Sequence, residues 1–234
     1  MKVLQGLVNS PLALRFLEVL DRRSENRMTE FGMLAQAFEF AKINGVKGDY
    51  FEFGVWRGKT FGYARTMARR YRVSPIVFRA FDSFAGLPSV DRNTNHEIWA
   101  EGQFACSKPE FERILAAKGF QPGEYALVEG FYDQSLSEGL IRELRASNVK
   151  AAIVNIDCDL YESTVPVLRF IRHFLQNGTI LCFDDYFNYR GQPGYGEQKA
   201  LAEFLEANPE IRLSPYMPYS PLGQSFICTL NARN

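Results

Sequence analysis

DYFEFGVWRGKT, residues Asp49–Thr60, is the most informative stretch of this 234-residue chain. It begins as a short apolar run with aromatic residues, reaches Glu52, and passes through Gly54 and Gly58 into a segment with helical spacing. This order predicts a strand, a glycine turn and a helix start, which together favour binding of a nucleotide-like ligand. The spacing Glu-x-Gly-x-x-x-Gly lacks the three-glycine fingerprint of dinucleotide sites, so a nucleoside without phosphates fits better.

Length and charge predict one domain without a polyanionic partner. No shift of composition divides the chain, and 234 residues suffice for one α/β domain. We therefore expect a single domain over residues 1–234, with helices in 1–45 that cover the ligand and a Rossmann-like core in 46–234. Lysine plus arginine and aspartate plus glutamate number 27 each, which gives no reason to expect nucleic acid or a membrane as a partner.

The N-terminus and the cysteines favour a soluble, cytoplasmic protein. The start MKVLQGLVNSPLALRF is interrupted by Gly6 and Pro11 before a signal-peptide core accumulates, and no later run approaches the length of a membrane span. Four cysteines lie far apart and form no Cys-x-x-Cys pair. We expect them to be buried, reduced thiols rather than zinc ligands or disulfides.

Apolar periodicity and glycine, proline and N-cap signals divide the chain into alternating helices and strands. The expected helices are Pro11–Arg22, Thr29 to Asn44-Gly45, one from the opening turn to about Arg72, Ser107 to Gly119 with a capping box to Glu110, Asp133–Ser147, Thr164–Gln176, and one ending near Ala207. The expected strands are the start of Asp49–Thr60, Pro75–Asp82, Tyr125–Glu129, Lys150–Asp157, Thr179–Asp184, Ile211–Tyr216 and Ser225–Leu230. The alternation predicts a parallel sheet, and the last two strands, joined without a helix, predict an antiparallel pair.

Acidic residues follow each of the first five expected strands. They are Glu52, Asp82, Glu129, Asp157, Asp159, Asp184 and Asp185. Ligands of open parallel sheets bind beyond the carboxyl ends of the strands, so these side chains predict a site there. Any single acid has the alternative role of an N-cap for the next helix, but the whole set is harder to explain in that way.

Asp82 is the candidate for ribose recognition. It lies 24 positions after Gly58, close to the offset of about 20 residues at which an acid meets the ribose hydroxyls of a nucleotide on the glycine turn. The alternative is that Asp82 only caps the turn that begins at Ser83.

Asp157, Asp184 and Asp185 are candidate metal ligands, because they end two strands that the usual winding makes neighbours. Carboxylates brought together repel one another unless a cation is present. Ligands that are all oxygen select a hard divalent ion, magnesium first. A hydroxyl bound to such an ion has a lowered pKa and can act as a nucleophile.

Two long aromatic loops supply further candidates. Ser83–Phe104 is long enough to be functional, and its His96 is either a general base or a solvated side chain. The loop Tyr186–Gly196 offers aromatic side chains that either wall a substrate or pack within the loop, namely Tyr186, Phe187, Tyr189 and Tyr195.

Four segments together resemble the macrocin O-methyltransferase family. They are EFGVWRGKT at Glu52–Thr60, AFDSFAGLP at Ala80–Pro88, NIDCDLYEST at Asn155–Thr164 and CFDDYF at Cys182–Phe187. The members of this family use S-adenosylmethionine and magnesium to methylate sugar hydroxyls of macrolides and related natural products. The resemblance implies the class I methyltransferase fold, an α/β Rossmann-like fold with a seven-stranded, mostly parallel sheet, a C-terminal antiparallel pair and helices on both faces.

The resemblance also implies roles for individual residues. Glu52, Gly54 and Gly58 would line the methionine and ribose side of the cofactor, and Asp82 would hold the ribose with Ser83 and Phe84 beside the adenine. The remaining residues expected to bind the cofactor are Phe53, Lys59, Thr60 and Asp157. The implied metal ligands are Asp157, Asp184 and Asp185, with Asp157 and His96 as catalytic candidates.

The implied reaction is in-line transfer of the methyl group from the sulfonium to a hydroxyl, in which alignment supplies much of the rate. The expected partner is a small molecule with a sugar vicinal diol or a catechol, and a homo-oligomer is left open. One alternative is a non-catalytic S-adenosylmethionine-binding protein. A nicotinamide-dependent oxidoreductase would need the glycine fingerprint that is missing, and a metal-dependent hydrolase would leave the glycine turn without a ligand.

Overall fold

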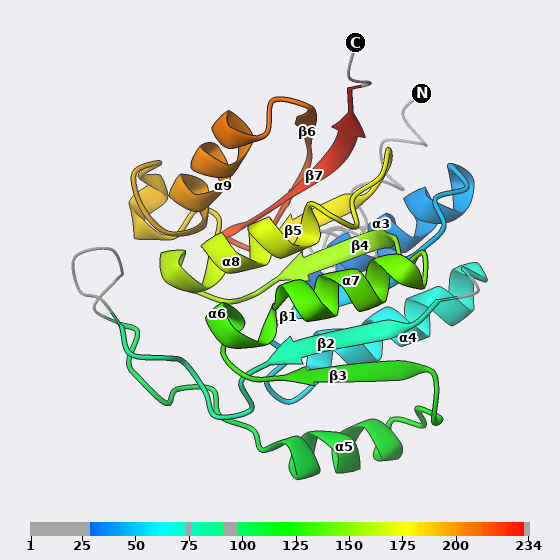
Figure 1. Ribbon diagram of the computed structural model, residues 1–234. Coiled ribbons are helices and arrows are strands. Elements are labelled where there is room, and N and C mark those ends of the chain that lie inside the picture. Colours follow the sequence, from blue (N-terminus) through cyan, green and yellow to red (C-terminus); the bar gives the residue numbers. More distant parts are fainter. Residues whose placement is uncertain (1–28, 74–75, 91–97, 232–234) are drawn as a thin grey trace, which may run out of the picture.

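Seven strands form one sheet in the order β3-β2-β1-β4-β5-β7-β6 in the computed structural model, which describes residues 29–73, 76–90 and 98–231 (Figure 1). The strands are β1 (Asp49–Phe53), β2 (Phe78–Asp82), β3 (Tyr125–Glu129), β4 (Ala151–Ile156), β5 (Ile180–Phe183), β6 (Ile211–Tyr219) and β7 (Gly223–Leu230). Strands β1 to β5 pair in parallel, whereas β7 is antiparallel to both β5 and β6. The predicted fold class is confirmed, including the adjacency of β4 and β5.

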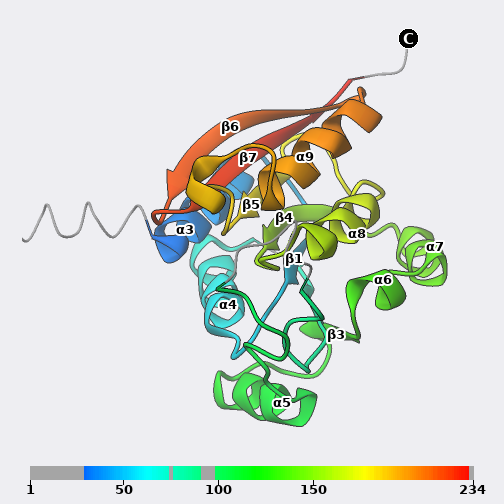
Figure 2. The ribbon, with the colours of Figure 1, turned by 90° about the vertical axis from the view of Figure 1, so that its left-hand side faces the viewer.

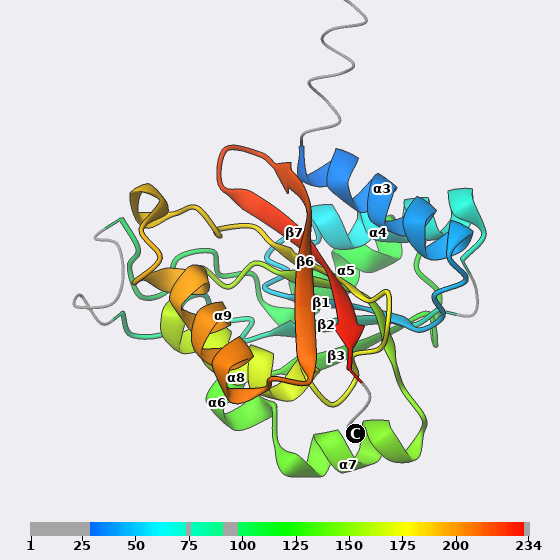
Figure 3. The same ribbon diagram turned by 90° about the horizontal axis from the view of Figure 1, so that it is seen from above.

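Helices cover both faces of this sheet (Figure 3). They are α3 (Glu30–Ile43), α4 (Lys59–Tyr71), α5 (Lys108–Ala117), α6 (Tyr132–Ser135), α7 (Glu138–Ala146), α8 (Tyr161–Ile171) and α9 (Gly196–Ala207), with a short 3-10 helix η2 (Tyr189–Gly191). One core cluster joins the sheet to α3, α4 and α5, and a second joins it to α7, α8 and α9. No helix in these described ranges is long and apolar enough to cross a membrane.

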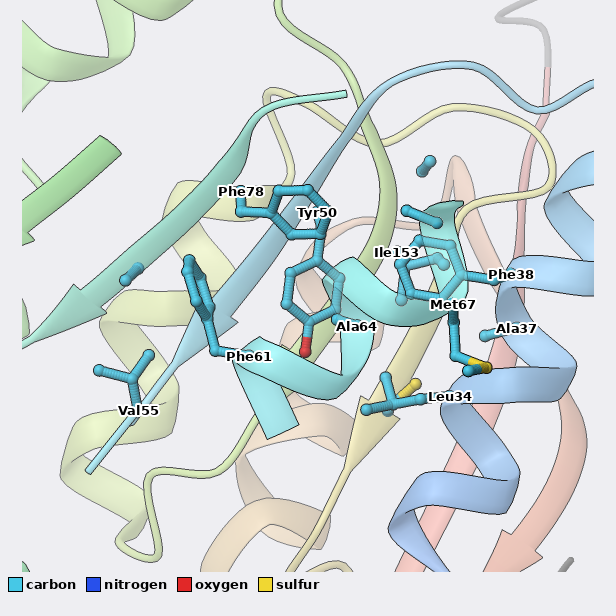
Figure 4. Packing of buried hydrophobic residues seen from close by; sticks show 14 of the residues in the cluster. Leu34, Ala37, Phe38, Tyr50, Val55, Phe61, Ala64, Met67, Phe78 and Ile153 are labelled. Carbon is cyan, nitrogen blue, oxygen red and sulfur yellow. The ribbon is translucent and has the colours of Figure 1, made fainter. Parts of the chain in front are cut away.

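Aromatic side chains fix the position of α4 under β1. In Figure 4, Tyr50 of β1 lies between Phe38 of α3 and Phe61 of α4, with ring centroids 5.9 Å and 6.0 Å apart respectively. All three rings are buried, and Phe61 also stacks on Phe120 at 5.4 Å. Because β1 and α4 flank the glycine turn, this packing holds the two sides of the turn in place.

Two helix predictions need correction. The single helix expected over Asp133–Ser147 is divided into α6 and α7, because the Ser137 hydroxyl accepts the Leu140 N–H at 3.3 Å and starts a new helix. The helix expected over Thr164–Gln176 is α8, which begins earlier and ends at Ile171, and its last turn is followed by a tight i to i+3 turn. Ser107 precedes α5 as predicted, but it makes no side-chain capping bond.

The C-terminal hairpin is longer than predicted. Strand β6 continues to Tyr219 through Pro215 and Pro218, which an edge strand tolerates because one side of its backbone has no partner strand. The ladder shifts register between Pro215 and Met217, as at a β-bulge. The helix expected over Pro11–Arg22 lies outside the described residues. All four cysteines are buried and free, as predicted.

Arg65 connects α4 to the segment that leads into β3. Its guanidinium, 8% exposed, donates to the backbone carbonyls of Lys118 at 3.2 Å and Gly119, and to the carboxylate of Glu124 at 2.7 Å. It also lies over the Phe120 ring at 4.7 Å. Against the effect of burial, hydrogen bonds from Arg65, the Gln121 N–H and Arg69 hold the pKa of Glu124 at about 2.

Replacing Arg65 with methionine is expected to lower the free energy of unfolding by about 3 kcal/mol, because two carbonyls and a carboxylate lose a buried charged donor. Urea unfolding at neutral pH measures this. Arg69→Met is the control, since Arg69 binds the same Glu124 but is 60% exposed, and a loss below about 1 kcal/mol is expected. Equal losses in the two variants would contradict the assignment of Arg65 as the buried charged donor.

The lowered pKa of Glu124 also makes the free energy of unfolding depend on pH. The stabilisation that the ionised Glu124 contributes is present above its ordinary pKa near 4.5 and is lost as the pH falls toward 2.

Candidate functional site

A cavity of about 560 Å³ opens at the carboxyl ends of the parallel strands. Figure 2 views the molecule from the side at which these strands end. The cavity is lined by Gly54, Trp56, Asp82, Ser83, Gly86, Leu87, Pro88, Ser89, Trp99, Gln103, Phe104, Gly130, Phe131, Tyr132, Asp133, Gln134, Asp157, Cys158, Asp159, Glu162, Ser163, Asp184 and Asp185. Residues that follow β1, β2, β3, β4 and β5 all contribute, so the cavity lies at the sheet edge where the sequence predicted a site.

Gly54 brings the ends of β1 and β4 into direct backbone contact. Its φ is +84°, and a Cβ there would lie 1.8 Å from the Asp157 carbonyl oxygen. The Asp157 N–H donates to the Phe53 carbonyl at 2.9 Å, and the Gly54 N–H donates to Phe81 at 3.0 Å. Gly58 then ends the turn at φ +61° as the N-cap of α4. The strand, glycine turn and helix start are therefore present as predicted, and they bound the cavity through Gly54.

Asp82 lines the cavity and also ties the glycine turn to β2. Its carboxylate accepts the N–H groups of Val55 at 2.8 Å, Trp56 at 3.3 Å and Phe84 at 2.7 Å. Burial raises the pKa of Asp82, and these three hydrogen bonds oppose the rise. The bond from Phe84 is the turn-capping contact considered as an alternative role. Ser83 lines the cavity too, and its hydroxyl donates to the Gly86 carbonyl at 2.7 Å.

Six residues expected to bind the cofactor lie outside the cavity lining and support its walls. Glu52 is fully buried and accepts hydrogen bonds from the hydroxyls of Tyr50 and Thr60. Phe53 stacks on Phe81 with centroids 4.4 Å apart. Lys59 is exposed and pairs with Glu30 of α3. The other two are Gly58, at the helix start, and Phe84, whose buried ring packs on Phe111.

Glu52 is expected to make stability fall as the pH rises. Burial first, opposed by the hydrogen bonds from Thr60 and Tyr50, raises the pKa of Glu52 from 4.5 to about 8. Between these values the folded chain holds a proton that the unfolded chain has released, so this stabilisation is complete below pH 4.5 and lost as the pH rises through 8. Glu52→Gln removes the titration, and its unfolding free energy should fall less steeply with pH, by roughly 1.4 kcal/mol per pH unit. Urea unfolding of both proteins across this window measures the difference, and parallel curves would refute it.

Asp157, Asp159 and Asp185 bring one carboxylate oxygen each within 4.8 Å of the others. Burial, and then the charges of Asp184, Asp159 and Asp185, raise the pKa of Asp157 well above its usual value. Burial and the charge of Asp185 raise the pKa of Asp184 to about 7. Such a set of repelling carboxyls is the donor set that a hard divalent cation stabilises.

The structure groups the acids differently from the prediction. Asp159 was recognised as a strand-end acid but was not assigned to the metal, yet it lies in the group of three. Asp159 lies two residues after Asp157 and has a φ of +60°. In this conformation its carboxyl lies beside that of Asp157 and is hydrogen-bonded to Asp185. Asp184 lines the cavity without belonging to that group. The Asp-x-Asp spacing of Asp157 and Asp159 is the signal in the sequence that points to Asp159.

The aromatic walls also differ from those considered. Tyr186, Phe187, Tyr189 and Tyr195 do not line the cavity; Tyr186 packs on Phe183 and Phe226, and Tyr189 stacks on Tyr195 at 5.8 Å. The aromatic lining residues are instead Trp56, Trp99, Phe104, Phe131 and Tyr132. Trp99 and Phe104 belong to the long loop 83–104, which its length marked as functional. His96 lies in that loop but outside the described residues.

The strand order with its antiparallel C-terminal pair, and the cavity beside the glycine turn, define the class I methyltransferase fold. The structure of CalS11, a calicheamicin methyltransferase, superposes with a TM-score of 0.69 at 25% identity, covering 97% of this chain and 90% of that one. The O-methyltransferase NovP has a TM-score of 0.67 at 22% identity, over 87% and 79% of the two chains, and supports the fold alone.

The macrocin-O-methyltransferase (TylF) family model matches residues 24–207, and the chain belongs to this family. It is 26% identical over 180 residues to the 8-demethyl-8-(2,3-dimethoxy-alpha-L-rhamnosyl)-tetracenomycin-C 4'-O-methyltransferase of Streptomyces olivaceus, covering 70% of this chain and 66% of the relative. It is 26% identical over 167 residues to the mycinamicin III 3''-O-methyltransferase of Micromonospora griseorubida, covering 68% and 63%. The chain thus spans just under two thirds of the length of these curated relatives.

Proposed function

We propose that this protein transfers a methyl group from S-adenosylmethionine to a hydroxyl of a small natural product, with magnesium as the metal ion. The single observation that carries the proposal is the shared cavity. Gly54 and Asp82, which suit a nucleoside, and Asp157, Asp159 and Asp185, which suit a cation, open into the same space of about 560 Å³. This volume lies in the ordinary range of small-molecule sites.

The donor half is assigned to residues of the first two strand ends. Asp82, Ser83, Gly54 and Asp157 are the expected contacts, because all four line the cavity. Asp82 is the ribose partner: its Oδ1 accepts one backbone N–H, which leaves it a further acceptor position. Glu52 and the other five residues outside the lining are proposed to act through the shape of the turn. The carboxyls that line the cavity also favour a positively charged sulfonium over a neutral donor.

The acceptor half is assigned to the acids that follow β4 and β5. A magnesium ion fits the group formed by Asp157, Asp159 and Asp185. Each offers a carboxylate oxygen, these three oxygens lie within 4.8 Å of one another, and the carboxylates repel one another without a cation. When bound, the ion supplies the lowered pKa of a coordinated hydroxyl. Asp157 is the proposed catalytic residue, because it borders both halves. Asp184, which lines the same space, is proposed to complete the ligand set as the sequence predicted.

Relatives suggest the acceptor class. The two curated relatives are named for the 4'-hydroxyl of a rhamnosyl tetracenomycin and the 3''-hydroxyl of mycinamicin III, and a structure related at 23% identity is described as a TDP-rhamnose 3'-O-methyltransferase. We therefore propose a sugar hydroxyl with a neighbouring oxygen as the acceptor. The aromatic lining residues, led by Trp99 and Phe104, provide flat apolar surface for the rest of the molecule.

Incubation with S-adenosylmethionine, magnesium and a panel of acceptors tests the function. The panel contains mycinamicin III, a rhamnosyl tetracenomycin, TDP-rhamnose and a simple catechol, and mass spectrometry detects product and S-adenosylhomocysteine. Methylation of at least one sugar, abolished by a chelator and restored by magnesium, is expected. Binding of S-adenosylmethionine without transfer to any acceptor would favour the non-catalytic alternative, and binding of NAD alone would refute the proposal.

A further inference from the structure

Glu197 is a buried acid at the start of α9 for which the proposed reaction gives no role. It shares a helix face with Ala200, Leu201 and Phe204, which pack in the second core cluster. At such a position the helical pattern predicts an apolar side chain. Glu197 is nevertheless only 1% exposed, and an unpaired buried carboxyl is costly.

The contacts of Glu197 lead to the acid group. Its Oε2 accepts the backbone N–H of Asp185 at 3.2 Å. Its Oε1 has no hydrogen-bond partner among the residues that the structure describes. The Asp185 carboxylate is held separately, by the Asn188 side-chain amide at 3.1 Å and by Asp159. Glu197 therefore fixes the peptide of Asp185, while the other two residues fix its side chain.

The chain around α9 brings Glu197 to this point. Gly196 has φ +52°, and a Cβ there would lie 2.4 Å from the Tyr189 ring, which stacks on Tyr195. Glycine thus allows α9 to begin directly against the loop that follows β5. On the far side, α9 packs along α8 (Figure 3). The start of α9 therefore lies against Tyr189, and Glu197 is buried beside it.

We infer that Glu197 is a positioning residue, which accepts the Asp185 N–H and so presents the Asp185 carboxylate to the cation beside Asp157 and Asp159. This inference rests on the proposed metal site. In this role Glu197 serves only as the acceptor of the Asp185 N–H. Glutamine has the same shape and still offers an oxygen acceptor, whereas methionine has a similar size and offers none. A role in core packing alone predicts the reverse, because methionine fills the space without burying an acid.

The test compares Glu197→Gln, Glu197→Met and Glu206→Met, the last an exposed acid on the same helix as control. Titration with Mn²⁺ followed by electron paramagnetic resonance gives the metal affinity. We expect a loss of about 10- to 100-fold for Glu197→Met. Glu197→Gln and Glu206→Met are expected to stay within about threefold of the wild type, because the glutamine oxygen still accepts the Asp185 N–H and Glu206 is exposed. Calorimetric binding of S-adenosylhomocysteine should be unchanged in all three and also reports that each variant is folded.

Amide hydrogen exchange of the segment 184–188 in the metal-free proteins separates this inference from the proposed function. Exchange is expected to be roughly three- to tenfold faster in Glu197→Met than in the wild type or Glu197→Gln, whether or not a metal binds. A wild type that binds no Mn²⁺ refutes the metal site, and the exchange comparison then decides the role of Glu197 alone. Unchanged exchange and metal affinity in Glu197→Met, or equal losses in the Gln and Met variants, would overturn the inference.

Discussion

Asp157→Asn is expected to lower the rate of methyl transfer by roughly 10²- to 10³-fold and to raise the thermal stability of the metal-free protein. Asp157 is half-buried at the end of β4, where it lines the cavity, and burial followed by the charges of Asp184, Asp159 and Asp185 raises its pKa well above the usual value. Without a cation the ionised form of Asp157 is therefore unfavourable, and a bound cation would stabilise it. Asparagine keeps the shape and one ligand oxygen but removes the charge.

The stability gain of Asp157→Asn is expected to be about 1 kcal/mol, or about 2–4 °C in the melting temperature for a chain of this size. Scanning calorimetry with and without magnesium measures it, and the wild type should gain more from the metal than the variant does. Glu129→Gln is the control, because Glu129 is also a strand-end acid but is exposed and pairs with Lys108. A variant that transfers methyl groups at the wild-type rate, with both proteins indifferent to a chelator, would end the metal hypothesis.

The fold was predictable because its signals are local. The alternation of β-branched or aromatic runs with helical periodicity, and the glycine turn at Gly54, are each contained in a few neighbouring residues. The division between α6 and α7 depends on one side chain, since the Ser137 hydroxyl competes with the preceding helical turn for a backbone N–H. Such a competition between two weak local preferences is decided by the packing around it.

The acids were predictable as a set, and their individual roles were not. Asp184 and Asp185 are neighbours in the turn after β5 and both line the cavity, but only Asp185 belongs to the group of three, and the sequence does not say which of the two does. Asp159 joins the group through a left-handed backbone conformation at φ +60° that no pattern announces. Glu197 is harder still to find from the sequence, because its proposed role depends on a contact between α9 and the turn after β5, across twelve positions of the chain.

The cavity walls required tertiary contacts that sequence spacing does not contain. Hydrogen bonds join the Leu87 N–H to the Gln103 carbonyl and the Gly102 N–H to the Leu87 carbonyl, both at 2.9 Å. They fold the loop 83–104 back on itself and bring Trp99 and Phe104 to the mouth of the site. The length of the loop indicated function, but the aromatic residues that line the cavity depend on this pairing, which the length does not reveal.

Gly54→Ala is expected to lower the free energy of unfolding by about 3 kcal/mol and to abolish measurable binding of S-adenosylhomocysteine. Two independent effects add. The φ of +84° strains any residue with a Cβ, and that Cβ would lie 1.8 Å from the carbonyl oxygen of Asp157, which is backbone and cannot rotate away. Either β1 or β4 must then move, and each carries one half of the proposed site.

Gly45→Ala separates the two effects of the Gly54 substitution. Gly45 also has a positive φ, +66°, but nothing lies within 4 Å of a Cβ built there, so only the backbone strain of about 1 kcal/mol is expected. Urea unfolding gives both losses, and calorimetry gives the ligand affinity. The excess loss in Gly54→Ala then measures how closely β1 and β4 must approach. Equal losses of unfolding free energy in the two variants, with ligand binding retained in Gly54→Ala, would contradict this prediction. They would mean that a contact other than the approach of Gly54 to Asp157 holds the donor half beside the acid group.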